Sequence, residues 1–305
     1  NGGLSKMSRA EAKALAEKGG GKISGAVSKK LDYLVVGDSK PTPKKFKKAK
    51  QLNIKRLSGL NIIDLIIDNG ILKGAIGLYV DTGEYIIINS NAIVLAAGGL
   101  TRIFSRNSAS LNMGGDAYAL ALRAGAELID MEFAQFFPIG HLAPRLVGMD
   151  PIMWDPFRYK LGGKLLNGKL EQFIENYGAK DGETYTVSRD LASFAIIKEV
   201  EAGRGSPNGG AWLSFRHVPS EDLHKAFGPI IKKLADNNID LTKEDIEVSP
   251  IAHYHMGGIK VNLKMQTTVN GLFAAGEAVG GANGANRLSG NAIPEAFVFG
   301  DTPKT

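Results

Sequence analysis

The chain has 305 residues, of which 44% are hydrophobic and 22% are charged, proportions that are ordinary for a globular protein with a buried core. It contains no cysteine, which excludes disulfides and metal sites built on its own thiolates, and which fits a cytoplasmic protein. No apolar run reaches the roughly 18 residues that a membrane-spanning helix needs, so we expect no transmembrane segment.

The positive charge is concentrated at the N-terminus. Residues 1–58 hold 15 Lys and Arg against 4 Asp and Glu, whereas the remaining residues hold 22 against 27. A composition change of this size predicts a domain boundary near Leu57 to Leu60. The net charge of +6 therefore does not indicate nucleic-acid binding by the whole chain.

The basic segment alternates helical and strand patterns. Ser8 and Glu11 form a capping box before a short helix, residues 31–37 are typical of a strand, and residues 43–52 favour a lysine-rich helix. The stretch LSKMSRAEAKALAEKGGGKISGAVSKKLDYLVVGDS, with the rest of residues 3–58, resembles the BRCT module of bacterial NAD-dependent DNA ligases.

The BRCT resemblance implies a small α/β segment that makes weak DNA or phosphopeptide contacts. The phosphate contacts that it implies are Lys22, Ser28, Lys29 and Lys30. The alternative is a solvated lysine-rich face without a partner.

From Asn61 the pattern changes to strands. Four apolar runs are separated by DNG and DTG, which are strong turn signals, and they predict a β-meander that leads into a buried strand. Residues 114–133 then favour a helix that turns Ala119, Leu122 and Ala126 toward a sheet or a cofactor.

Two glycine-rich stretches look like walls of a ligand site. They are AIVLAAGG, residues 92–99, and GLFAAGEAVGGANGANRLSGNA, residues 271–292. Glycine lets a phosphate or a flavin ring approach the backbone, and Glu277 is suited to ribose hydroxyls. Either cluster alone also fits a turn or tight packing.

The segment PIAHYHMGG, residues 250–258, adds His253 and His255 on one side of an extended segment. A metal pair would need further ligands, which the sequence does not place nearby, so we expect no metal. His253, Arg287 and Arg189 would instead orient carboxylates. For each of them alone, a structural salt bridge is the alternative.

Five motifs carry a second resemblance: AIVLAAGGLTRIF, GDAYALALRAGAELIDMEFAQF, SRDLASFAIIKEVEAGRG, IAHYHMGGI and GLFAAGEAVGGANGANRLSGNAI. In order and spacing they resemble the flavoprotein subunits of fumarate reductase and succinate dehydrogenase, over residues 61–300. The resemblance implies an α/β fold, with a Rossmann-like FAD-binding domain at 61–130 and 251–300 and an α+β capping domain inserted at 131–250. It also implies FAD, a small carboxylate substrate and an electron-transfer partner subunit.

The resemblance assigns roles by position. Arg189 corresponds to the residue that transfers the proton, and His253 and Arg287 correspond to the clamps of the substrate carboxylates. The flavin-binding stretches correspond to Ala97, Gly98, Gly99, Asp116, Gly276, Glu277, Asn291, Ala292 and Ile293.

The departures from the family pattern matter as well. Phe137 stands where the family has a histidine, and a pocket of Phe137, Trp154 and Phe157 predicts a substrate with one carboxylate and an apolar remainder. No GxGxxG turn between a strand and a helix occurs, so we expect an incomplete FAD-binding domain that holds FAD weakly unless a partner supplies that half. The alternative function is a non-catalytic binding protein that joins the BRCT-like module to a flavoprotein remnant.

Overall fold

The structure is a computed structural model that describes residues 59–144, 154, 161–179 and 187–300. The described residues form two compact units, the first from 59–100, 113–133 and 255–300 and the second from 101–112 and 134–254. Each unit is described by itself below. The BRCT-like segment and Phe157 lie outside the described residues.

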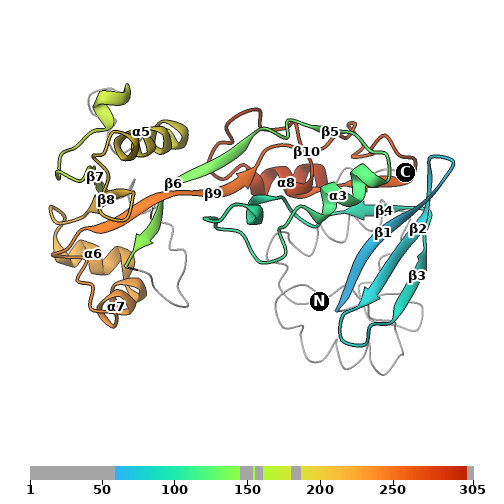
Figure 1. The fold of residues 1–305 in the computed structure, drawn as a ribbon, viewed down its shortest axis with the longest axis horizontal. Helices are drawn as coiled ribbons and strands as arrows, with labels where there is room; N and C mark the ends of the chain where they lie inside the picture. The colour runs from blue at the N-terminus through green and yellow to red at the C-terminus, as the bar shows by residue number, and fades with distance from the viewer. Residues whose placement is uncertain (1–58, 145–153, 155–160, 180–186, 301–305) are drawn as a thin grey trace. The chain divides into compact units, whose positions relative to one another are not determined.

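The first unit begins with the predicted meander (Figure 1). Strands β1 (Leu60–Asp68), β2 (Ile71–Tyr79) and β3 (Tyr85–Asn89) form one sheet in that order, with antiparallel neighbours. Asn69 and Gly70 adopt left-handed φ angles of 49° and 75°, which explains why DNG makes the first turn. The prediction of strands broken at DNG and DTG is confirmed.

The fourth predicted strand, β4 (Ile93–Leu95), pairs in parallel with β11 (Leu272–Ala274). Both glycine-rich stretches follow these two strands, AAGG after β4 and AAGE after β11. Because the carboxyl ends of parallel neighbours meet at one edge of a sheet, strand pairing brings together motifs that are almost 180 residues apart in sequence, a separation of about 178 between Leu95 and Phe273.

Two further short elements complete this region. β5 (Leu128–Ile129) pairs with β10 (Gly258–Ile259), and the 3₁₀ turn η3 (Gly276–Ala278) follows β11 and contacts α8 (Ala292–Gly300).

The helix predicted at 114–133 is shorter than expected, and its buried face is different. α3 spans Asp116–Arg123 and buries Ala117, Tyr118, Leu120 and Ala121. Ala119 is exposed and Leu122 is 59% exposed, so the predicted face was wrong. Leu128 and Ile129, within the predicted helix, form β5 instead. Gly125 follows the helix with φ 93°, a conformation that ends a helix and that glycine adopts without strain.

The second unit is built on a four-stranded sheet in the order β6-β9-β8-β7. The strands are β6 (Ala134–Ala143), β7 (Lys164–Leu166), β8 (Ala211–Ser214) and β9 (Ile246–His255). The helices of this unit are α5 (Arg189–Glu201), α6 (Ser220–Phe227) and α7 (Pro229–Ala235), and its 3₁₀ turns are η1 (Thr101–Ile103) and η2 (Ile174–Tyr177). Figure 1 shows α5 above the strands of this unit and α6 and α7 below them.

The core of the second unit joins the sheet to all three helices. Trp154 is fully buried and packs against Phe215 and Phe227, with ring centroids 6.2 and 5.8 Å away. The structure therefore corrects one expectation, because Trp154 is a core residue and does not line a substrate pocket. A large aromatic ring fills more core volume than it can expose in a small cavity.

The predicted domain boundaries stay a prediction, and one segment lies elsewhere than expected. Residues 101–112 belong to the second unit, because Arg106 and Ser108 exchange backbone hydrogen bonds with Ala252 of β9 at 3.0 and 2.9 Å.

Candidate functional site

Gly99 and Glu277 meet at the edge formed by β4 and β11. A Cβ atom added at Gly99 would lie 2.5 Å from the Glu277 Oε1 atom, so a side chain at 99 would displace the carboxylate. Gly98 and Gly276 have left-handed φ angles of 81° and 69°, and the space beside the Gly276 Cα is open. The glycines at these positions therefore keep the backbone bare around one half-buried carboxylate.

The Glu277 carboxylate is held by the backbone of a second motif. Its Oε1 atom accepts a hydrogen bond from the His255 backbone N–H at 3.1 Å. Tyr118 on α3 donates its hydroxyl to the Glu277 carbonyl at 2.9 Å and lies 3.1 Å from the Gly257 carbonyl. Burial raises the pKa of Tyr118, and the Glu277 charge raises it further, so this hydroxyl stays a donor at physiological pH.

His255 itself is buried and does not share the surroundings of His253. Its ring nitrogens lie 2.9 and 3.2 Å from the carbonyl oxygens of Gly257 and Met131. In the described residues, no group of three or more His, Cys, Asp or Glu side chains is placed to hold a metal ion.

Other glycines of these motifs have a different reason. A Cβ at Gly280 would meet the Gly258 amide nitrogen, a Cβ at Gly258 would lie 2.7 Å from the Ala278 carbonyl, and a Cβ at Gly257 would meet the Asp130 carbonyl. These three positions are therefore cleared for the protein's own backbone where β10 passes the segment after η3. The sequence pattern alone does not separate them from Gly98, Gly99 and Gly276.

The N-terminal end of α8 carries the remaining flavin-binding candidates. Asn291 precedes the helix, Ala292 and Ile293 open it, and Asn291 and Ile293 are exposed. Asp116 is exposed at the start of α3, and Ala97 is exposed after β4. Arg287 is only 6% exposed, and its Nη1 donates to the Leu288 carbonyl at 3.2 Å.

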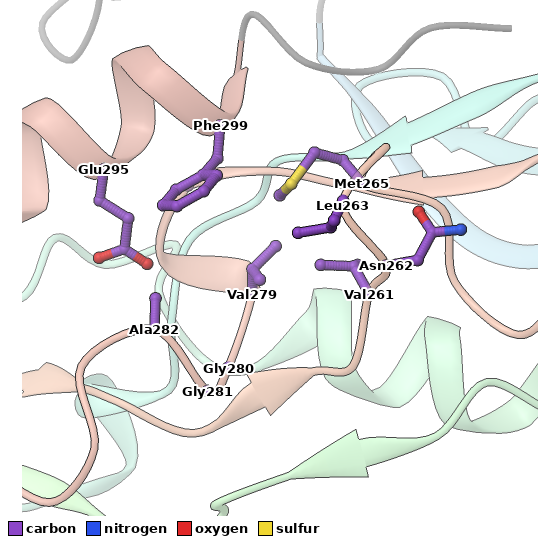
Figure 2. Close-up of a pocket in the computed structure, with 11 residues that line it drawn as sticks. Val261, Asn262, Leu263, Met265, Val279, Gly280, Gly281, Ala282, Glu295 and Phe299 are labelled. Atoms are coloured by element: carbon purple, nitrogen blue, oxygen red, sulfur yellow. The ribbon is translucent and has the colours of Figure 1, made fainter.

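A cavity of about 450 Å³ lies in the first unit beside Gly276. Figure 2 shows Glu295 and Phe299 projecting from α8 on one side and Val261, Leu263 and Met265 on the other. The segment Val279–Ala282 forms a wall of small side chains, and Asn262 and Glu295 are the polar members of the lining. A mostly apolar cavity of this size suits a flat ring system.

The second unit carries Arg189 and His253. Arg189 is the first residue of α5, and its Nη1 donates to the Gln135 Oε1 atom at 3.1 Å. The guanidinium carbon lies 5.2 Å from the centre of the Phe137 ring, and the His253 ring lies 5.3 Å from the same ring. Phe137 is only 2% exposed, so it supports both polar side chains from beneath.

Ser108 fixes the orientation of His253. The Ser108 Oγ atom lies 2.8 Å from the His253 Nδ1 atom and 3.5 Å from the Ala252 carbonyl. When the imidazole is neutral, the hydroxyl donates to Nδ1 and the ring proton sits on Nε2. When the imidazole is charged, Nδ1 donates to Oγ and the hydroxyl turns to the Ala252 carbonyl, so the ring keeps its place in both states.

Sequence reasoning missed Gln135 and Ser108. Gln135 lies two residues before Phe137 on β6, so the strand period places both on one face, and that signal was available. Ser108 is 145 residues from His253, and no local pattern connects them.

The comparisons with known proteins identify the class. The FAD binding domain family model matches residues 43–293, and the BRCA1 C Terminus (BRCT) domain model matches residues 2–58. The chain therefore belongs to the FAD binding domain family, and FAD is its cofactor. The BRCT resemblance is confirmed as well.

The similar proteins include a particular kind of flavoprotein. The chain is 40% identical over 247 residues to an uncharacterized FAD-dependent oxidoreductase of Methanocaldococcus jannaschii, and 36% identical over 248 residues to the flavoprotein-like chain of the fumarate reductase (CoM/CoB) of Methanothermobacter marburgensis. Each match covers 81% of this chain and 44% of the relative. A structure of a mutant FrdA of the Escherichia coli quinol fumarate reductase aligns with a TM-score of 0.73 and 32% identity, over 85% of this chain and 46% of that one.

These relatives establish homology to fumarate reductase flavoproteins over most of the chain. The chain spans less than half the length of the relatives that it matches. Within the described residues, no helix has the length and apolar character needed to cross a membrane.

The first unit fits the cofactor. Glu277 is an oriented carboxylate that can accept hydrogens from sugar-chain hydroxyls, and the bare backbone at Gly98, Gly99 and Gly276 admits a ligand. The residues present therefore suit FAD.

Proposed function

We propose that this chain is the flavin-binding and substrate-binding part of an FAD-dependent oxidoreductase that acts on a carboxylate-bearing substrate. The observation that carries the proposal is the arrangement on Phe137, where Arg189 is held by Gln135 and His253 is held by Ser108. Two fixed donors of this kind suit a substrate anion.

The proposal assigns FAD to the first unit. Gly98, Gly99, Gly276 and Glu277 would hold its sugar chain, and the amide groups at the start of α8 would face electronegative atoms of the ring. When bound, FAD supplies hydride exchange with a carbon–carbon bond next to the carboxylate.

The proposal assigns substrate handling to the second unit. Arg189 would carry the proton and His253 would orient the carboxylate through its Nε2–H, as the family resemblance implies. Gln135 fixes the Arg189 guanidinium, which matters because a proton donor must be positioned before its pKa is useful. The clamp role of Arg287, in the first unit, remains a prediction.

Phe137 and Trp154 do not form an apolar substrate pocket, since both are buried beneath other side chains or in the core. We therefore infer a substrate with at least one carboxylate and make no claim for its remainder. An electron-transfer partner subunit is proposed from relatives that are named as subunits of fumarate reductases. The cytoplasmic location stays a prediction.

Replacement of Arg189 tests the assignment. In the flavin-loaded protein, Arg189→Gln should lower turnover with fumarate or another unsaturated carboxylate by about 10²-fold, the usual effect of losing a general acid, with flavin content unchanged. Arg216→Gln is the matched control, because Arg216 is an exposed arginine of the same unit, 3.8 Å from Asp245. Turnover near the parent value in Arg189→Gln would contradict the role.

A second candidate function is favoured by the match of residues 2–58 to the BRCT domain model. In that case the chain is a non-catalytic binding protein with a flavoprotein remnant, and the basic segment makes the DNA or phosphopeptide contacts. The absorbance spectrum of the purified chain separates the two functions, since only the oxidoreductase requires a flavin band.

A further inference from the structure

A second cavity, of about 330 Å³, lies in the second unit along residues 102–111. Its polar lining comes from Arg102, Ser105, Arg106, Asn107 and Ser110. Within the part of the chain that the structure describes, this lining contains two arginines and no carboxylate. The cavity is therefore a small, positively charged space separate from the residues assigned above.

The backbone of the cavity wall is fixed by β9. Arg106 accepts a hydrogen bond from the Ala252 N–H at 3.0 Å, and the Ser108 N–H donates to the Ala252 carbonyl at 2.9 Å. Ile251, next to Ala252, lines the cavity and is only 1% exposed. The segment thus behaves as an added strand, which holds its side chains in fixed register.

Arg106 is held from both neighbouring strands. Its Nη2 lies 3.4 Å from the His141 carbonyl of β6 and 3.5 Å from the Ser249 carbonyl of β9. These contacts orient a half-buried guanidinium toward a wall of the cavity. A planar guanidinium fixed in this way can present further N–H groups in a fork.

Arg102 supplies the second charge. It is exposed on η1, and its Nη1 lies 3.5 Å from the Asn107 Oδ1 atom, a long contact that holds it weakly. The Asn107 amide is itself fixed, since its nitrogen donates to the Phe104 carbonyl at 2.7 Å. No described carboxylate lies within ion-pair distance of Arg102, so this charge is available to an incoming anion.

We propose that this cavity binds a small oxyanion, in the form of a phosphate or carboxylate group. Two guanidinium groups would bind its oxygens through charge-assisted hydrogen bonds, and the Ser105 and Ser110 hydroxyls would complete the shell. The proposal goes beyond the oxidoreductase function, because none of these residues belongs to the flavin or substrate assignment.

Calorimetric titration of the full chain with inorganic phosphate and with malonate, at constant ionic strength, tests the proposal. We expect saturable binding, with Kd raised at least tenfold in Arg102→Gln, since charge-assisted hydrogen bonds contribute about 1.5–3 kcal/mol. Arg102→Gln is preferred over a change at Arg106, whose backbone contacts support the fold. The anion with the lower Kd distinguishes a phosphate ligand from a carboxylate ligand.

Two control variants make the outcome decisive. Arg123→Gln removes an exposed arginine of the first unit that pairs with Asp64 at 3.2 Å, and it should leave Kd unchanged. Arg189→Gln should also leave Kd unchanged, whatever the oxidoreductase assay gives. The proposal is overturned if neither anion binds saturably, if Arg102→Gln binds as well as the parent, or if Arg189→Gln is the variant that loses binding.

Discussion

At His253, one hydroxyl decides which ring nitrogen carries the proton. Ser108 lies 2.8 Å from Nδ1 and has the Ala252 carbonyl 3.5 Å away as its other acceptor. Glu277 is fixed in a comparable way, by the His255 backbone N–H. In both cases a backbone or hydroxyl partner, supplied from a distant part of the sequence, orients the group that would meet a ligand.

Ser108→Ala should therefore release the His253 tautomer. In the parent, the neutral imidazole should carry its proton on Nε2, which ¹⁵N chemical shifts report without any activity assay. In Ser108→Ala the two tautomers should mix, because the lost hydrogen bond is worth about 0.5–1.5 kcal/mol. Ser105→Ala, on the same segment, should behave as the parent. A parent imidazole with its proton on Nδ1 would contradict the account.

At the scale of elements, α5 is placed by a buried acid at its C-terminal end. Glu199 is 2% exposed and binds the Arg204 guanidinium at 2.7 and 2.9 Å. It also accepts hydrogen bonds from Tyr177 of η2 at 2.6 Å and from Asn167 at 3.0 Å. Because Arg189 is the first residue of this helix, the cluster at one end of α5 helps to place the functional arginine at the other.

The Glu199 cluster should make stability depend on pH. The hydrogen bonds from Arg204, reinforced by those from Tyr177 and Asn167, lower the pKa of Glu199 from 4.5 to about 2. A lowered carboxyl pKa stabilises the fold fully above the unfolded value, and that contribution is lost as the pH falls from 4.5 toward 2. Denaturant unfolding at pH 7 and at lower pH measures this loss.

Arg204→Ala tests the same cluster directly. It should destabilise the protein by about 2–3 kcal/mol at neutral pH, less than for a fully buried pair because the Arg204 side chain is 39% exposed. It should also reduce the dependence on acid. Arg216→Ala, which removes an arginine that is 59% exposed, should change stability by less than about 1 kcal/mol. Equal effects of the two variants would show that Glu199 is not held as described.

The cavity beside Gly276 belongs to the same scale, because it lies between α8 and the segment Val279–Ala282. Ala282→Leu should fill part of it and weaken FAD binding at least tenfold, with unfolding unchanged because Ala282 is exposed. Ala285→Leu, on the same loop but outside the lining, should leave FAD binding unchanged. If both variants bind FAD as the parent does, the cavity takes no part in holding the cofactor.

At the scale of the whole molecule, sequence patterns predicted what is local. The DNG and DTG turns divided the meander correctly, and the five ordered motifs led to the FAD binding domain family. Long-range pairing was not predictable from such patterns. Gly280 is cleared for Gly258, Trp154 belongs to a core, and Ser108 meets His253 across 145 residues. Each of these depends on which segments the fold brings together.

The central claim is that the first unit binds FAD through the bare backbone around Glu277, and a fluorescence titration of the chain with FAD tests it most directly. The account predicts saturable binding that weakens at least tenfold in Glu277→Gln, since the amide can still accept the His255 N–H but loses the charge and one acceptor site for hydroxyls. Glu127→Gln is the control, because Glu127 is an exposed acid of the same unit paired with Lys260 at 2.6 Å. Absence of saturable FAD binding, or equal affinity in the parent and Glu277→Gln, would contradict the account.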